Sequence, residues 1–135
     1  MKIEMSNVSM SYRTSSRGRT VRALESVDAD VAEAEFLALV GPSGCGKSTL
    51  LKLAAGLLRP TTGEIRLGGD VVKGPRTDVG FMFQAPVLLP WMSVLDNVTI
   101  QARVRGLESR RYLERSRELL TQVGLEGYEE RYVFE

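Results

Sequence analysis

A short glycine-rich stretch carries the residues of this sequence that are best suited to chemistry. It runs from Gly41 to Thr49 and reads G-P-S-G-C-G-K-S-T. The spacing of glycine, four residues, glycine, lysine and serine is typical of loops that bind the phosphates of a nucleoside triphosphate. In such a loop the glycines let successive backbone N–H groups face one anion, and the helix that follows adds its partial positive charge. The sequence therefore predicts a triphosphate-binding site. The alternative is a glycine-rich turn that happens to carry a lysine.

Each position of the loop has an expected part in that site. Lys47 is expected to reach the β- and γ-phosphates, and the Ser48 hydroxyl to bind Mg²⁺. We expect contacts with the nucleotide from Gly41, Ser43, Gly44, Cys45, Gly46, Lys47, Ser48 and Thr49. We also hypothesise that alkylation of the Cys45 thiol crowds the phosphates and blocks nucleotide binding. Cys45 is equally well explained as a small filler at a variable position.

The loop needs a strand before it and a helix after it. The apolar run Phe36 to Val40 predicts a buried strand, and Lys47 to Leu58 predicts a helix. Apolar residues lie on more than one side of that helix, which favours a position in the middle of a domain. Gly56 weakens its last turns, and Pro60 prevents its continuation.

Further strands and helices are expected on both sides of this segment. Ile3 to Tyr12 and Val21 to Val31 predict two antiparallel strands, the second with Leu24 and Val27 directed inward. Short strands are expected at Glu64 to Leu67, Val71 to Val72 and Asp78 to Phe83. Two helices are expected at Ser93 to Arg105, with Ser93 and Asp96 as a capping box, and at about Ser109 to Val123, with one charged, solvated face.

The composition limits the class of protein. The 135 residues suffice for one domain, and 43% hydrophobic with 26% charged residues is ordinary for a globular protein. A net charge of +1 gives no reason to expect nucleic acid as a partner. A single cysteine and the absence of histidine exclude disulfides within the chain and histidine-based triads or zinc sites. Without a signal segment or a membrane-spanning apolar run, we expect the chain in the cytoplasm.

Several motifs together resemble the ATP-binding subunit of an ABC transporter. They are the loop itself, the helix sequence L-L-K-L-A-A-G-L and the turn P-T-T-G-E-I. The stretch from Val79 to Val98 is similar to importers of the nitrate, sulfonate and taurine type. The resemblance covers about residues 1 to 132. It implies an incomplete α/β fold of the P-loop NTPase, ABC ATPase type. An antiparallel β part is expected at 1–35, a P-loop core with part of a parallel sheet at 36–84, and the start of a helical subdomain at 85–135.

The resemblance also implies roles for residues outside the loop. Tyr12 would stack on the adenine of ATP, unless it is a strand tyrosine packed against a neighbour. Gln84 would bind Mg²⁺ or the attacking water and act with Lys47 in hydrolysis, unless it is an ordinary loop residue. The apolar loop, residues Pro86 to Met92, would meet a membrane-embedded permease, unless it is tucked into its own core. A second ATP-binding subunit, forming a homodimer in the full-length form, and a place on the cytoplasmic face of the inner membrane are implied as well.

The sequence departs from the family pattern after Arg131 and Tyr132. The Leu-Ser-Gly-Gly signature, the Asp-Glu strand end and the switch histidine do not occur in it. We therefore expect a truncated, marginally stable chain that binds ATP weakly or not at all and does not hydrolyse it alone. One alternative is a non-catalytic interaction protein that docks to a permease or to a full-length partner. Another is a different phosphate-loop enzyme, although no Asn-Lys-x-Asp motif of GTPases occurs and a small kinase leaves Gln84 without a role.

Overall fold

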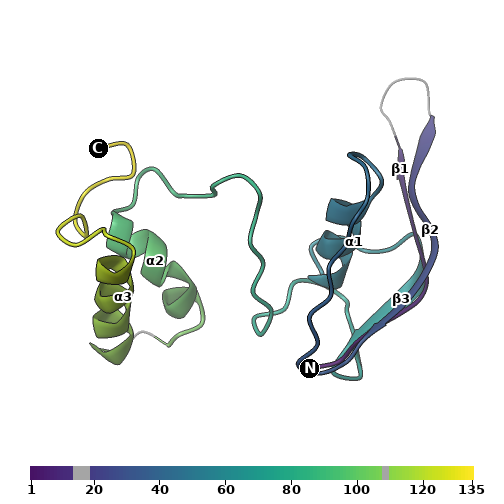
Figure 1. The fold of residues 1–135 in the computed structure, drawn as a ribbon, viewed down its shortest axis with the longest axis horizontal. Coiled ribbons are helices and arrows are strands. Elements are labelled where there is room, and N and C mark those ends of the chain that lie inside the picture. The colour runs from purple at the N-terminus through teal and green to yellow at the C-terminus, as the bar shows by residue number, and fades with distance from the viewer. Residues whose placement is uncertain (14–18, 108–109) are drawn as a thin grey trace. The chain divides into compact units, whose positions relative to one another are not determined.

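The computed structural model describes residues 1–13, 19–107 and 110–135. It consists of two compact units, Met1–Phe81 and Met82–Glu135. The first unit holds a β-sheet and one helix, and the second holds two helices (Figure 1). The division into three parts expected from the sequence stays a prediction.

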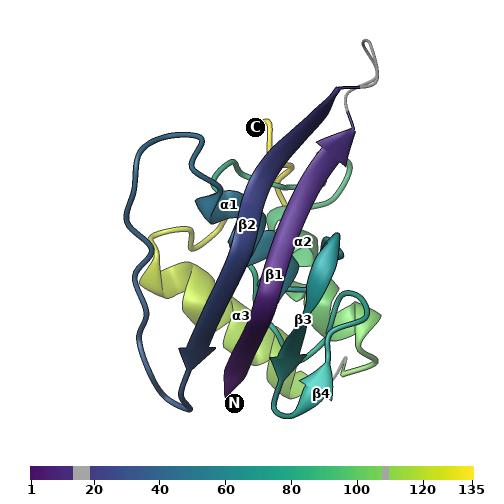
Figure 2. The ribbon, with the colours of Figure 1, turned by 90° about the vertical axis from the view of Figure 1, so that its right-hand side faces the viewer.

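The first unit is built on a four-stranded sheet. Its strands are β1 (Ile3–Arg13), β2 (Thr20–Val31), β3 (Thr62–Leu67) and β4 (Asp70–Val71). They lie in the order β2-β1-β3-β4, and each neighbouring pair is antiparallel (Figure 2). The expected antiparallel pairing of the first two strands is confirmed, as are the two short strands that follow the helix.

Helix α1 (Lys47–Ala54) packs its apolar side on this sheet. Leu53 from the helix joins Met5, Val8 and Ile65 from the strands in the buried core. Leu24 and Val27 of β2 pack against this cluster, as their inward positions in the strand predicted. Burial of a leucine-sized side chain contributes about 2 kcal/mol, so the packing of Leu53 stabilises α1 against the sheet.

Helix α1 is shorter and more exposed than expected. It ends at Ala54 rather than Leu58, because Gly56 adopts a left-handed backbone (φ 72°) and the Leu57 N–H turns back to the Lys52 carbonyl at 2.9 Å. Leu51 and Leu57 remain 50% and 40% exposed. The expectation of a helix enclosed on more than one side is therefore wrong at Leu51, which lies on α1 and stays half exposed.

Two expected strands do not form. Phe36 to Val40 and Asp78 to Phe83 have no regular structure, and Phe36 and Val40 are 91% and 94% exposed. A strand needs a neighbour with which to exchange backbone hydrogen bonds. Within the described ranges neither segment has one, and the observed pairings are all antiparallel. The expected part of a parallel sheet is thus not formed by the residues that the structure describes.

The second unit contains α2 (Val94–Val104) and α3 (Arg110–Gln122), which pack against each other. The Ser93 hydroxyl accepts a hydrogen bond from the Asp96 N–H at 3.1 Å, which confirms the predicted cap. The expected start of the last helix, Ser109, lies outside the described residues. No helix in the described part of the chain has the length and apolar character needed to cross a membrane.

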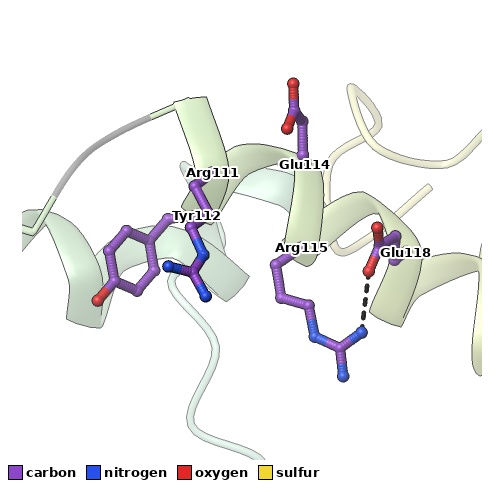
Figure 3. A pocket seen from close by; sticks show the side chains of 5 residues that line it. All are labelled: Arg111, Tyr112, Glu114, Arg115 and Glu118. Atoms are coloured by element: carbon purple, nitrogen blue, oxygen red, sulfur yellow. Dashed lines mark hydrogen bonds and ion pairs between the residues drawn. The ribbon is translucent and has the colours of Figure 1, made fainter.

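One side of α3 is charged and exposed, as predicted. Arg110 pairs with Glu114 at 2.8 Å, and Arg115 pairs with Glu118 at 2.9 Å. Figure 3 shows the second pair near Arg111 and Tyr112, which line the same pocket. Positive and negative side chains alternate there, so this face carries no concentrated charge of either sign.

Candidate phosphate-binding site

The glycines of the loop have the backbone conformations that the phosphate-binding pattern requires. Gly44 and Gly46 lie in the left-handed region, with φ of 79° and 99°. Gly46 is the N-cap of α1, and its carbonyl accepts the first helical hydrogen bond, from Leu50 N–H at 2.9 Å. The chain therefore turns tightly before the helix begins, and the loop ends at the N-terminus of α1, which carries a partial positive charge.

The Lys47 side chain folds back over this loop. Its ammonium donates hydrogen bonds of 2.7 Å to the carbonyl oxygens of Gly41 and Pro42 and lies 3.5 Å from the Cys45 sulfur. These contacts hold the cation at the loop instead of letting it extend into solvent. A phosphate group in the loop would be a stronger, charged acceptor for the same donor.

The loop also rests on strand β2. A Cβ atom added to Gly46 would lie 2.7 Å from both the Ala23 carbonyl oxygen and the Leu24 Cδ2. Close packing thus leaves no space for a side chain at Gly46, quite apart from any nucleotide. Sequence analysis placed Leu24 in the core but missed that β2 supports the loop. No spacing signal could have indicated it, because the contact depends on how the hairpin packs.

Tyr12 is brought to the loop from the end of β1. Its hydroxyl lies 3.5 Å from the Thr49 hydroxyl oxygen, and the side chain is 38% exposed. The structure therefore joins two predicted site residues from distant parts of the sequence. The exposed fraction leaves ring surface accessible, and adenine stacking by Tyr12 stays a prediction.

The two predicted Mg²⁺ ligands, Ser48 and Gln84, belong to different units of the structure. Ser48 is exposed in the first turn of α1, beside Lys47. A hydroxyl oxygen is a suitable ligand for Mg²⁺, which takes few protein ligands and completes its shell with water and substrate phosphates. Binding of Mg²⁺ by Ser48 stays a prediction. Gln84 is exposed and belongs to the second unit, so its contact with the metal stays a prediction.

The apolar loop, Pro86 to Met92, is largely exposed. Val87, Leu88 and Trp91 are 66%, 51% and 70% exposed, whereas Leu89 and Met92 are half-buried. The expectation that this loop exposes apolar surface is confirmed. The alternative, a loop tucked into its own unit, holds only for the two half-buried side chains.

Comparison with known proteins identifies the family. A family model described as "ABC transporter" matches residues 24–135. The uncharacterized ABC transporter ATP-binding protein MJ0412 of Methanocaldococcus jannaschii is 40% identical over 135 residues, which are 100% of this chain and 51% of that protein. The taurine import ATP-binding protein TauB of Escherichia coli is 42% identical over 113 residues, 84% of this chain and 44% of TauB.

A solved structure agrees with this result. It is a dimer of the ATP-binding cassette MJ0796 in a post-hydrolysis state bound to ADP and Pi, with a TM-score of 0.82 and 28% identity over 98% of this chain and 62% of the other. The expected α/β fold of the P-loop NTPase, ABC ATPase type is thereby confirmed. The chain spans about half the length of the curated relatives it matches. With the family model covering most of its residues, this chain belongs to the ABC transporter family.

Proposed function

We propose that this chain binds ATP with Mg²⁺ through the loop Gly41 to Thr49 and acts as the energy-coupling subunit of an importer for a small solute. The observation that carries the proposal is the loop itself. Two left-handed glycines precede α1, and the Lys47 ammonium is held over the loop by carbonyls 2.7 Å away. The taurine import relatives support the importer assignment.

Each residue of the site has its own role in binding or hydrolysing ATP in this proposal. Backbone N–H groups from about Gly44 to Thr49 surround the phosphates, and Lys47 exchanges its carbonyl partners for β- and γ-phosphate oxygens. Ser48 holds Mg²⁺, which when bound neutralises the charge of these phosphates. Tyr12 stacks on adenine. Gln84 contributes an amide that can orient the attacking water, because an amide both donates and accepts hydrogen bonds.

Two protein partners belong to the proposal. The apolar loop is the surface that meets the membrane-embedded permease, since Val87, Leu88 and Trp91 are all exposed within it. A second copy of the ATP-binding subunit completes the working unit, as in the dimeric cassette to which this chain is similar. Such a chain acts on the cytoplasmic face of the inner membrane.

Equilibrium binding of a fluorescent ATP analogue with Mg²⁺ tests the nucleotide site. Lys47→Ala should weaken binding by about tenfold or more, because a charge-assisted hydrogen bond contributes about 1.5–3 kcal/mol. Lys52→Ala is the matched control, as it removes the same charge from an exposed position on α1. Equal affinities of the two variants would contradict the proposal.

A second candidate is docking without turnover, and the exposed apolar loop is the observation that favours it. Co-purification with a taurine-type permease tests the docking, and release of phosphate from ATP tests the turnover. Docking that is lost on Trp91→Ser, without phosphate release sensitive to Lys47→Ala, would favour this second candidate.

A further inference from the structure

We propose that Asn97 is the positioning residue of the apolar loop: its amide locks the segment Leu89 to Ser93 and so presents Val87, Leu88 and Trp91 in a fixed arrangement for the partner. The inference rests on the proposed docking role of this loop. It adds the residue that prepares the surface before any partner arrives.

The Asn97 amide is hydrogen-bonded to the loop at both ends. Its Oδ1 accepts from the Leu89 N–H at 2.8 Å. Its Nδ2 donates to the carbonyl oxygens of Leu89 at 3.1 Å, Met92 at 3.2 Å and Ser93 at 2.9 Å. The amide can do both, because its oxygen accepts and its NH₂ group donates. Aspartate has the same shape but offers acceptors only.

The helix that carries Asn97 is itself held at its start. Ser93 caps α2 through the Asp96 N–H, and the first two helical N–H groups, of Val94 and Leu95, donate to the Arg131 and Glu129 carbonyls at 2.9 Å each. The N–H groups that a helix start leaves without helical partners are thus satisfied. Asn97 therefore projects from a fixed support, and its contacts can order the loop instead of following it.

The apolar side chains of the locked loop fall into a half-buried set and an exposed set. Leu89 and Met92, whose backbones the amide binds, are half-buried, whereas Val87, Leu88 and Trp91 point to solvent with half or more of their surface exposed. A flexible loop of this composition would lose conformational entropy on docking. Holding it beforehand reduces that cost and so favours binding.

Asn97→Asp is the variant that tests the lock, with Gln101→Glu as its matched control. Both change an amide into an acid on α2, and Gln101 is exposed one turn further along. Two local readouts apply: hydrogen exchange of the Leu89 amide, and acrylamide quenching of Trp91, the single tryptophan of the chain. Asn97→Asp keeps an acceptor for the Leu89 N–H but loses the Nδ2 donor, and the carboxylate is repelled by the carbonyls of Leu89, Met92 and Ser93. The expected result is therefore a released loop, with stronger quenching of Trp91 and Leu89 exchange faster by about tenfold, and neither change in the control.

Other outcomes would overturn the inference. One is that both variants leave Trp91 quenching and Leu89 exchange equal to those of the unmodified chain. Another is that Asn97→Asp accelerates exchange throughout α2 and α3, which would make Asn97 a general packing residue. Should the variant not fold, the unmodified chain decides: Leu89 must exchange more slowly than Val87 and Leu88, and equal rates would end the proposal. None of these measurements needs ATP or a permease, so failure of docking and failure of the lock are distinguishable.

Discussion

The Tyr12 hydroxyl lies 3.5 Å from the Thr49 hydroxyl oxygen, which places an aromatic ring from β1 at the end of the phosphate-binding loop. The two residues are 37 positions apart in the sequence. Their contact links the strand hairpin to the first turn of α1. Whether this ring also contacts the adenine of a nucleotide bound in the loop stays a prediction.

Substitution of Tyr12 separates the ring from its hydroxyl. Tyr12→Ala should weaken ATP binding by about 1–3 kcal/mol, the contribution of one base stacked on an aromatic side chain. Tyr12→Phe keeps the ring and should bind nearly as well as the unmodified chain. The measurement compares ATP with inorganic triphosphate, which has no base and should bind all three proteins equally. A similar loss for inorganic triphosphate would mean that Tyr12 supports the loop rather than the adenine.

Alkylation of Cys45 should block the phosphate site. The thiol is exposed, it lies 3.5 Å from the Lys47 ammonium, and it is the single cysteine of the chain, so the reagent modifies one place. Treatment with N-ethylmaleimide should weaken binding of the ATP analogue by about tenfold or more, the effect of displacing one charge-assisted hydrogen bond. Cys45→Ser, treated identically, is the control. Unchanged binding by the alkylated chain would show that position 45 tolerates bulk.

The two left-handed glycines of the loop should differ in their effect on folding. Gly44→Ala introduces only backbone strain, about 1–2 kcal/mol, because nothing lies within 4 Å of the added carbon. Gly46→Ala adds an overlap with Ala23 and Leu24 at 2.7 Å, which should cost about 1–3 kcal/mol more. Urea denaturation without nucleotide measures both. Equal losses of stability would mean that the hairpin moves aside at no cost.

Asp96 should make the stability of the second unit depend on pH. The hydrogen-bonded Arg103 guanidinium, and then Ser93, lower the pKa of Asp96 below its ordinary value of 3.8. A lowered folded-state pKa means that the carboxylate stabilises the fold above its unfolded pKa, and that this contribution is lost as the pH falls through the folded-state pKa. Both side chains are more than two-fifths exposed, so Asp96→Asn should cost only about 0.5 kcal/mol at pH 7.

The comparison of pH 7 with pH 2 checks this prediction. The difference in the free energy of unfolding between Asp96→Asn and the unmodified chain should shrink as the pH is lowered. Glu118→Gln, which removes a carboxylate from the exposed pair with Arg115, is the control and should change stability less. A difference that stays the same at both pH values would exclude the charge of Asp96 as its cause.

Local signals in the sequence were sufficient for several elements. The Ser93 and Asp96 cap depends on residues three positions apart, and the antiparallel hairpin on two strands that follow each other in the chain. The end of α1 was expected at Leu58, and the structure places it at Ala54. The prediction of a strand at Phe36 to Val40 was wrong because it needed information from distant residues. The apolar composition is typical of a buried strand, but a strand forms only where another strand is available to pair with it.

At the candidate site too, local sequence signals did not reveal the contacts between distant segments. The glycine and lysine spacing indicated the loop, and the resemblance added Tyr12, yet the support by β2 depends on packing that spacing does not encode. Asn97 was missed although a signal existed. Asparagine is a poor residue for a helix interior, because its side chain competes for backbone groups, and here it binds the loop backbone instead.

The packing of Gly46 against β2 affects how mutational scans of this loop should be read. A screen that scores only transport or ATP binding would rank Gly46 with Lys47, and both would be taken for ligand contacts. Variants at Gly46 would instead be depleted because the polypeptide accumulates poorly, whatever the concentration of ATP. Abundance must therefore be scored beside activity at every loop position, since the site and the stability of its scaffold share this one residue.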